Sequence, residues 1–316
     1  MGFDEMRAEH DELDTIWMDG EFVDWEDAQV HVLTHGLHYG TGVFEGVRTY
    51  DTENGPAIFR WDEHLERLYE SAKTYGMEIG FDPGALTEAT LDLIRTNDLA
   101  SCYIRPIAFY GSDSLGVSPG DNPTTTAIAV WPWGAYLGEE ALEKGVDVMV
   151  SSWRKHSSSQ IPTTAKTTGP YVNSMLATEE AKDNGYVEAI VLNKEGYVAE
   201  GPGENLFLVR DGELFTPALS QSILDGITRR SVIEVARDLG YTVHDQATIS
   251  RGELYNADEL FFVGTAAEVT PIKSVDDIEV GPGEKGPITD EIQTRFFEIV
   301  ERRTDDYEDW FTYVEE

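Results

Sequence analysis

Short apolar runs separated by turn residues occupy positions 16–60 and predict strands joined in hairpins. The run 16–18 precedes an Asp-Gly pair and the run 21–23 follows it, which is a typical hairpin pattern. A second turn, 51–55, joins the segments VRTY and AIFR. The N-terminal part therefore begins as a small β-structure.

Helical periodicity follows these strands. Leu65, Leu68, Ala72 and Tyr75 share one face of a predicted helix over 62–76, which Gly76 ends. A second helix is predicted near 85–97, and strands near 102–110 and 125–133. Residues 1–132 are therefore predicted to form a small N-terminal α+β domain.

The stretch WPWGAYLG, rich in Gly, Pro and aromatic residues, predicts an interdomain connection at 133–140. Residues 141–316 are then expected to form a larger C-terminal domain. Its predicted strands are 146–152, 187–192, 205–209 and 260–263, and its predicted helices are 171–184, 227–239 and 288–303.

The charge is the most unusual feature of the composition. The 316 residues include 60 Asp and Glu but only 23 Lys and Arg, so the formal net charge is −37. This charge repels phosphates and leaves no basic stripe, which argues against nucleic acid and against an anionic membrane surface. An evenly acidic, lysine-poor chain is expected in the cytosol of a salt-loving organism, such as a halophilic archaeon, where salt screens self-repulsion.

Cysteine content and hydropathy predict a cytoplasmic protein. Cys102 is the single cysteine, which excludes an internal disulfide and suits a reducing compartment. Residues 1–14 are polar and acidic, unlike a signal peptide. No apolar run approaches the roughly 18 residues that a membrane span needs.

Acidic residues are absent from three windows: 28–44, 99–112 and 148–178. Burial accounts for part of this pattern. Burial alone does not explain why the third window keeps Arg154, Lys155, His156 and Lys166. A cavity for an anionic ligand would explain it, because nearby carboxylates would repel such a ligand.

The eight lysines can be compared one by one as candidate catalytic amines. Seven of them, including Lys155, have polar or helical neighbourhoods and are predicted to be solvated surface charges. Lys166 lies in IPTTAKTTGPY, and the nearest acids are 13 and 19 residues away. Desolvation or a nearby cation could lower its pKa, which suits a nucleophile that forms a Schiff base, although an ordinary loop lysine is the alternative.

An aldehyde cofactor on Lys166 would need further groups. The glycine turn at 224–229 opens a predicted helix and could bind a phosphate, with Arg67 as a clamp. Gly264-Thr265-Ala266-Ala267 is a second turn of small residues after an apolar strand. Glu200 could pair with a protonated ring nitrogen. Helix caps and ordinary turns explain each fragment equally well when it is taken alone.

Two further patterns have simpler explanations than a bound ligand. His31, His35 and His38 have the spacing of helical metal ligands, but Gly36 and Gly40 make a helix improbable there, so no metal is expected. The segment Gly40-Thr41-Gly42 with Gly46 resembles a dinucleotide fingerprint only loosely, because it lacks the strand–helix context.

Taken together, the motifs resemble branched-chain amino acid aminotransferases, which are pyridoxal-phosphate enzymes of fold type IV. The resemblance covers about residues 14–300. It is carried, in order, by TIWMDGEFVDWEDAQVHVLTHGLHYGTGVFEGVR, RPI after SCYI, WPWGAYLG, SSW, IPTTAKTTGPYVNS, EGPGENLF, LDGITRRSVIEVA and FVGTAAEVTPI. It implies a small α+β domain and a larger barrel-like α/β domain, with pyridoxal 5′-phosphate in the crevice between them.

The resemblance also implies roles for individual residues. Lys166 matches the Schiff-base lysine and catalytic residue, Glu200 the partner of the pyridine nitrogen, and Tyr171 the phenol that bonds the ring oxygen. The phosphate would be held by Arg67, Leu224, Gly226, Ile227, Thr228 and Thr265. The substrate would be bound by Tyr39, Phe44, Gly46, Tyr103, Arg105, Trp133, Tyr136, Thr265 and Ala266.

The implied reaction is transamination between L-leucine, L-isoleucine or L-valine and 2-oxoglutarate. The partners are therefore small amino and oxo acids. Tyr39 is expected to come from a neighbouring subunit, which requires a homo-oligomer, either a dimer or a larger assembly such as a hexamer. Thr167, Thr168 and Pro170 depart from the family pattern but remove no named chemical group.

Alternatives remain within the fold and outside it. D-amino acid aminotransferases and aminodeoxychorismate lyases share the lysine and the phosphate cup. HGLHYGTGVFEG, YIRP and WPWGAYLG favour the L-branched-chain enzyme. A non-catalytic metabolite-binding protein is disfavoured because a binder needs neither Lys166 nor Glu200.

Overall fold

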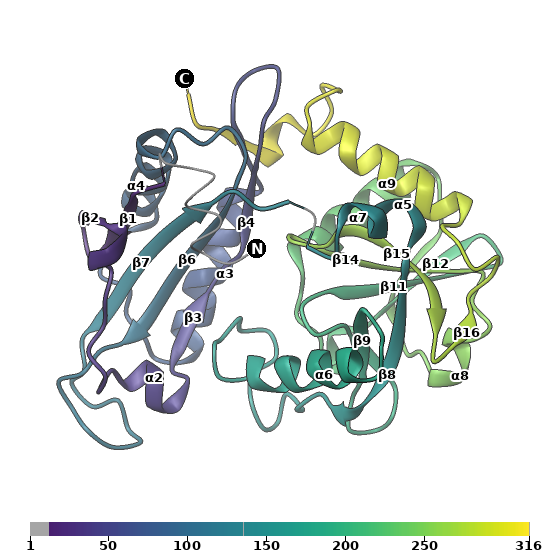
Figure 1. Ribbon diagram of the computed structural model, residues 1–316, viewed down its shortest axis with the longest axis horizontal. Coiled ribbons are helices and arrows are strands. Elements are labelled where there is room, and N and C mark those ends of the chain that lie inside the picture. The colour runs from purple at the N-terminus through teal and green to yellow at the C-terminus, as the bar shows by residue number, and fades with distance from the viewer. Residues whose placement is uncertain (1–12, 135, 316) are drawn as a thin grey trace. The chain divides into compact units, whose positions relative to one another are not determined.

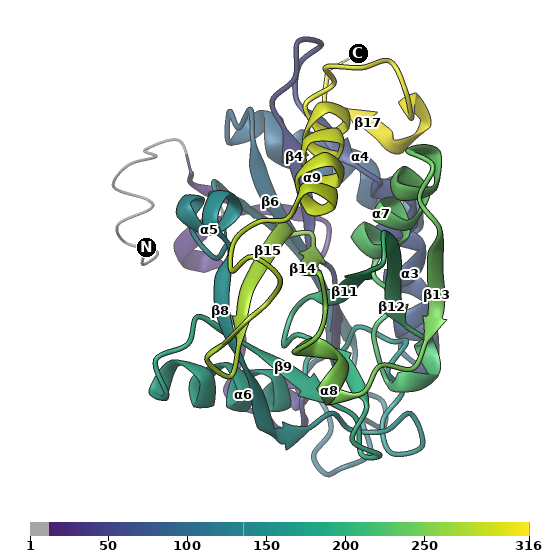
Figure 2. The same ribbon diagram turned by 90° about the vertical axis from the view of Figure 1, so that its right-hand side faces the viewer.

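The computed structural model describes residues 13–134 and 136–315, which form two compact units (Figures 1 and 2). Unit 1 comprises residues 1–133, 165–169 and 300–316. Unit 2 comprises residues 134–164 and 170–299. The predicted N-terminal boundary near 132 lies close to this division, whereas 165–169 and 300–316, expected in the C-terminal domain, belong to unit 1.

Unit 1 contains an eight-stranded sheet in the order β17-β5-β4-β6-β7-β1-β2, with β3 beside β6. All the pairs in this sheet are antiparallel. Its strands are β1 (Thr15–Met18), β2 (Glu21–Asp24), β3 (Gly42–Phe44), β4 (Val47–Tyr50), β5 (Ala57–Phe59), β6 (Cys102–Tyr110), β7 (Thr124–Trp131) and β17 (Phe311–Tyr313).

Two amphipathic helices bury their apolar faces with this sheet. Helix α3 spans Trp61–Thr74, and helix α4 spans Pro83–Thr96 with Asp82 as a side-chain N-cap and proline at its start. Their buried leucines share one apolar cluster with Trp17, Ile104 and Val130 of the strands. This packing supports β3 and β6, which carry the predicted site residues Phe44, Tyr103 and Arg105.

Unit 2 contains a nine-stranded mixed sheet in the order β10-β9-β8-β15-β14-β11-β12-β13, with β16 beside β15. The pairs β8–β9, β8–β15 and β12–β13 are parallel, and the others are antiparallel. Its strands are β8 (Val146–Arg154), β9 (Glu188–Leu192), β10 (Val198–Glu200), β11 (Asn205–Arg210), β12 (Glu213–Pro217), β13 (Val243–Ala247), β14 (Glu259–Gly264), β15 (Glu268–Val275) and β16 (Ile278–Glu279).

Helices surround this second sheet, as Figure 2 shows. The core strands are almost entirely buried: every residue of β9 is buried, as is every residue but the last of β11 and β14, as expected for strands covered on both faces. The helices are α5 (Glu139–Lys144), α6 (Tyr171–Asp183), α7 (Ile227–Asp238), α8 (Arg251–Leu254) and α9 (Pro287–Val300), the last residue of which belongs to unit 1.

The structure confirms each strand and helix predicted above to within a few residues. One expectation was wrong, since residues 35–39 form the short helix α2 (His35–Tyr39) despite Gly36. Gly40 does not interrupt this helix but ends it, in the left-handed conformation at φ 62°. Strand β15 was not predicted, since Pro271 interrupts its pattern, yet it lies between β8 and β14. Residues 1–12, on which the absence of a signal peptide was argued, lie outside the described part.

Candidate active site

Lys166 lies on a short extended segment that continues the sheet of unit 1. Its backbone amide donates to Ser71 Oγ at 3.0 Å, and its carbonyl accepts from the Phe44 amide at 3.1 Å. The Gly169 amide donates to the Gly40 carbonyl at 3.1 Å. A Cβ on Gly40 would lie 2.6 Å from Gly169 Cα, so glycine is required at position 40 for this approach.

The Lys166 side chain is partly buried and lies over Phe44, with Nζ 4.9 Å from the ring centroid. Burial lowers its pKa to about 8, since the charge of Glu45 raises the pKa only in part and Arg67 lowers it further. With this value about half of the amine is uncharged near pH 8, and a smaller fraction at neutral pH. The expectation of a desolvated lysine beside a cation therefore agrees with the geometry.

A buried carboxylate, Glu45, organises the cations beside Lys166. Its Oε1 accepts from Arg67 Nε at 2.7 Å, and its Oε2 accepts from Arg67 Nη2 at 2.8 Å and from His64 Nδ1 at 2.7 Å. Burial opposes ionisation of Glu45, but the charge and hydrogen bonds of Arg67 and His64 hold its pKa well below the usual range. Burial lowers the pKa of His64, which favours the neutral ring.

An aromatic cluster surrounds Arg105 in the same unit. The guanidinium carbon lies 4.9 Å from the ring centroid of Phe44 and 5.3 Å from that of Tyr103. Tyr103 in turn packs against Trp133, with ring centroids 4.6 Å apart. A Cβ at Gly46 would lie 1.8 Å from Tyr103 Oη, so only glycine fits at position 46. The structure therefore brings these five predicted substrate residues together.

Trp131 belongs to this cluster although the sequence analysis did not select it. Its ring lies 5.1 Å from Tyr103 and 5.8 Å from the Arg105 guanidinium carbon. On the adjacent strands β6 and β7, Tyr103 pairs with Trp131 and Arg105 pairs with Ala129. Arg105 Nε is buried and has no hydrogen-bond partner among the described residues, so the cluster can still bind an anionic oxygen.

Tyr39 and Tyr136, two further predicted substrate residues, are 46% and 39% exposed. Tyr39 ends helix α2 and packs on the His35 ring at 4.6 Å. Tyr136 belongs to unit 2, and neither tyrosine is buried.

Glu200 is the centre of a second polar cluster, which lies in unit 2. Its Oε2 accepts from Asn205 Nδ2 at 2.9 Å and from the Leu224 amide at 3.0 Å. Its Oε1 lies 2.6 Å from Lys155 Nζ. A Cβ at Gly226 would lie 2.0 Å from Asn205 Oδ1, so glycine at 226 leaves room for the amide that holds Glu200.

The prediction that Lys155 is a solvated surface charge is wrong. Its side chain is only 14% exposed and pairs with Glu200. Burial disfavours its charge, but Glu200, and to a smaller extent Tyr171, outweigh burial and raise its pKa. The partner is distant in the chain, which is why local composition did not reveal the pair.

The predicted phosphate residues of unit 2 occupy a helix start and a turn. Gly226 precedes helix α7, and the side chains of Ile227 and Thr228 in its first turn are buried. The first amides of a helix have no partner within it and favour an anion. Thr265 and Ala266 form the turn between β14 and β15. Tyr171 begins helix α6.

The histidines make local hydrogen bonds rather than a metal site. His35 Nδ1 lies 2.7 Å from Thr41 Oγ1, and its Nε2 lies 3.0 Å from the Gly116 carbonyl. His38 Nε2 lies 2.9 Å from the Val32 carbonyl. Over residues 13–134 and 136–315, no group of three or more metal-ligating side chains is found. Nor does any helix in the described chain have the length and apolar character to cross a membrane.

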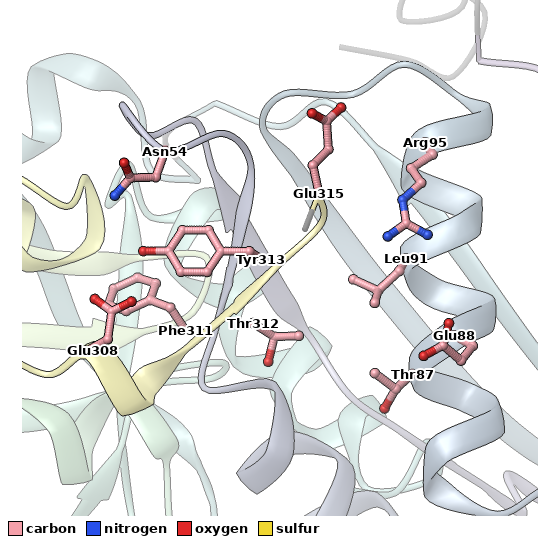
Figure 3. Close-up of a pocket in the computed structure, with 10 residues that line it drawn as sticks. All are labelled: Asn54, Thr87, Glu88, Leu91, Arg95, Glu308, Phe311, Thr312, Tyr313 and Glu315. Atoms are coloured by element: carbon pink, nitrogen blue, oxygen red, sulfur yellow. The ribbon is translucent and has the colours of Figure 1, made fainter.

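Two surface pockets away from these residues are alternative candidates for a binding site. The larger, about 700 Å³, lies in unit 1 between α4 and β17 (Figure 3). Glu88, Glu308 and Glu315 line it, and its Arg95 already donates to the Val314 carbonyl and to Asp92. This lining does not suit an anionic ligand.

The second pocket, about 530 Å³, follows strand β13 in unit 2. It includes His244, which stacks on Phe215 at 4.5 Å and pairs with Glu213 at 2.8 Å. Neither pocket is lined by a residue predicted to bind cofactor or substrate.

Unit 1 therefore carries a partly buried amine and an aromatic cluster with an arginine, and unit 2 carries a buried carboxylate, Glu200. The family described as amino-transferase class IV matches residues 42–275, and the chain belongs to this family. The branched-chain-amino-acid aminotransferase of Escherichia coli K12 is 51% identical over 302 residues, covering 95% of this chain and 97% of that protein. A Pseudomonas aeruginosa enzyme of the same name is 48% identical over 299 residues, covering 95% of this chain and 97% of that protein.

Solved structures agree with this assignment. An E. coli branched-chain amino acid aminotransferase has a TM-score of 0.93 at 51% identity and covers 96% of this chain and 99% of its own. The T.th. enzyme of the same name, solved with pyridoxamine 5′-phosphate, has a TM-score of 0.92 at 50% identity, with the same coverage. The fold-type-IV expectation is therefore confirmed.

Proposed function

We propose that this protein transfers the amino group of L-leucine, L-isoleucine and L-valine to 2-oxoglutarate with pyridoxal 5′-phosphate as cofactor. The observation that carries the proposal is the partly buried Lys166 amine, whose pKa is lowered to about 8, in a chain about half identical to branched-chain aminotransferases. The T.th. relative was also solved with N-(5′-phosphopyridoxyl)-L-glutamate, which joins this cofactor to glutamate.

The side chains present fit this cofactor. A desolvated amine suits covalent attachment to an aldehyde, and Lys166 provides it. Glu200 is a buried acceptor held by Asn205 and the Leu224 amide, as a partner of a protonated ring nitrogen must be. Arg67 and the first turn of α7, with Leu224, Gly226, Ile227, Thr228 and Thr265, provide cations and amides for a phosphate.

Bound pyridoxal phosphate supplies a carbonyl for the amino group and a ring that accepts the electrons of the substrate Cα–H bond. Lys166 Nζ would take the proton from the substrate Cα as a base and give the proton back as an acid, with the cofactor held beside it. Glu200 keeps a proton on the ring nitrogen, and Tyr171 donates to the ring oxygen. The second substrate reverses these proton transfers.

The substrate residues explain how one site accepts two kinds of side chain. Phe44, Trp133 and Tyr136 form an apolar surface for an aliphatic chain. Arg105, with Tyr39, binds the distal carboxylate of glutamate, because guanidinium pairs well with carboxylate. Gly46 and the amides of Thr265 and Ala266 are assigned to the α-carboxylate, and Tyr103 positions Arg105.

An Arg105→Ala variant is expected to lose about 10–100-fold in kcat/KM for L-glutamate, the scale of one hydrogen bond to a charged group. The loss with L-leucine should be smaller by at least about fivefold, because leucine has no distal carboxylate to leave unpaired. Half-reaction kinetics with each amino acid measure both values. Equal losses for the two substrates would remove Arg105 from its assigned role.

A homodimer is part of the proposal because Tyr39 acts from a neighbouring subunit. Five apolar residues of unit 1 support it, since each is 46–79% exposed in a strongly acidic chain: Val32, Leu37, Tyr39, Leu115 and Val117. His35 joins helix α2 to the loop that carries the last two, through the Gly116 carbonyl. A Leu37→Glu variant should shift the mass in light scattering from dimer towards monomer, whereas Glu66→Gln should not.

The cytoplasm of a salt-loving cell is the proposed location, supported by the net charge of −37 and the buried single cysteine. Salt screens the repulsion among the carboxylates. Thermal unfolding should therefore occur at higher temperature in molar KCl than at about 0.1 M, where the Debye length is longer. A midpoint temperature of unfolding that does not change with KCl would contradict the proposed salt-rich location.

The first experiment is the visible spectrum of the purified protein in molar KCl, before and after addition of L-isoleucine without an oxo acid. A band of the bound cofactor that converts to the pyridoxamine form supports both cofactor and half-reaction. Conversion by a D-amino acid instead would favour a D-amino acid aminotransferase. A band that no amino acid converts would favour an aminodeoxychorismate lyase, and no band even with added cofactor would favour a metabolite-binding protein.

A further inference from the structure

We propose that Glu45, with His64, is a positioning residue of this active site that holds the Arg67 guanidinium in a fixed orientation and offsets its charge beside Lys166. This inference rests on the proposed function, because Lys166 is the amine that Glu45 serves. Neither Glu45 nor His64 was selected from the sequence as a site residue.

The geometry supports a clamp rather than a chance contact. Both carboxylate oxygens of Glu45 are used for Arg67, at 2.7 and 2.8 Å, and His64 Nδ1 adds a third bond at 2.7 Å. His64 and Arg67 lie three residues apart on α3 and therefore share one helix face. The Glu45 amide donates to the Pro106 carbonyl at 2.9 Å, which fixes the carboxylate relative to β6.

The burial of the group makes its charges effective. Glu45, His64 and Arg67 are 0%, 2% and 8% exposed, so water screens them weakly. A two-point pair through Nε and Nη2 fixes the plane of the guanidinium and directs Nη1 away from Glu45. The remaining N–H groups are then oriented before an anion binds, which avoids the entropy of ordering a long side chain at that moment.

Glu45 also affects the protonation of the Lys166 amine. The groups whose charges act on its amine are Glu45, Arg67, Tyr103 and Arg105. Arg67 and Arg105 favour the uncharged amine, and Glu45 favours the ammonium form. Without Glu45 the two guanidinium groups would act on the lysine with no buried carboxylate to offset them.

The test is the titration of Lys166 in the full-length protein freed of cofactor, by competitive acetylation across pH and mass spectrometry of the peptide that contains it. Glu45→Gln keeps the shape but removes the charge. It is expected to lower the pKa of Lys166 by about one unit or more. Glu66→Gln, an exposed change one residue from Arg67, is the matched control and should leave the titration unchanged.

A charge cycle keeps the test decisive if the single variant folds poorly. Arg67→Gln should raise the pKa of Lys166, and the double variant with Glu45→Gln should return it close to the wild-type value. Glu45→Asp should restore the wild-type titration at least in part. A Lys166 titration that is the same in Glu45→Gln and wild type would overturn the proposal.

A second readout uses the cofactor-loaded enzyme. The pH at which its visible absorption changes should fall in Glu45→Gln but not in Glu66→Gln. Absence of any visible band in the wild type would contradict the proposed function, while the acetylation result would still decide the role of Glu45. The two failures can therefore be distinguished.

Discussion

Replacing Lys166 by alanine is expected to lower the rate of amino-group transfer by about 10⁴-fold or more. General acid–base catalysis alone typically contributes about 10²–10⁴-fold, and the variant also loses covalent attachment of the cofactor. Single-turnover reactions with L-isoleucine in molar KCl measure the rate. The bound cofactor should also lose the absorption of its lysine-linked form, even where it still binds through its phosphate.

The control for this variant is Lys73→Ala, an exposed lysine on helix α3 of the same unit. It removes the same charge and should retain wild-type activity. Methylamine should restore part of the activity of Lys166→Ala, because a small amine can occupy the vacated volume and carry the proton. Activity of Lys166→Ala within about tenfold of wild type would exclude this lysine as the catalytic base.

The acid-free windows predicted residues that lie far apart in sequence but close together in unit 1: the Phe44 ring centroid lies 4.9 Å from both the Arg105 guanidinium carbon and Lys166 Nζ. Window 28–44 contains Tyr39 and Phe44, window 99–112 contains Tyr103 and Arg105, and window 148–178 contains Lys166. In a chain with a net charge of −37, a segment without carboxylates is a strong local signal. Secondary structure was equally predictable wherever apolar periodicity was clear, as in α3.

Pairs distant in sequence could not be predicted in this way. Lys155 has a polar neighbourhood, and its partner Glu200 comes close only because β8, β9 and β10 are adjacent in the sheet. In the sequence, nothing distinguishes Glu45 among the 60 acidic residues of the chain. Its pairing with Arg67 depends on the packing of α3 against β3. Tertiary packing, rather than composition, determines which carboxylates are buried.

The two polar clusters differ in their charge balance, and this difference suits their proposed tasks. In unit 2, Glu200 and Lys155 neutralise each other. In unit 1, Lys166, Arg67 and Arg105 exceed the single carboxylate of Glu45. An excess of positive charge at least partly removed from water favours anionic groups such as phosphate and carboxylate. In unit 2, by contrast, Lys155 offsets the charge of Glu200. Burial of the Glu200 carboxylate beside the protonated ring nitrogen of the cofactor then costs less desolvation energy.

Replacing Glu200 by glutamine is expected to reduce kcat by about 10³-fold, the scale of one preorganised electrostatic group. Gln keeps the hydrogen bonds to Asn205 and the Leu224 amide but loses the negative charge. Steady-state kinetics with L-leucine and 2-oxoglutarate measure this effect. The same change leaves Lys155 buried without its counter-ion, which should lower the free energy of unfolding by about 3 kcal/mol.

A double variant separates these two consequences. Lys155→Met with Glu200→Gln removes both charges, and replacement of a buried ion pair by groups of similar volume is often nearly neutral for stability. Denaturant unfolding of the double variant should therefore approach the wild-type value, whereas kcat should stay about 10³-fold low. Recovery of activity together with stability would mean that Glu200 acts only by holding Lys155. Persistent inactivity in a stable protein is the result expected if its charge is needed at the cofactor ring.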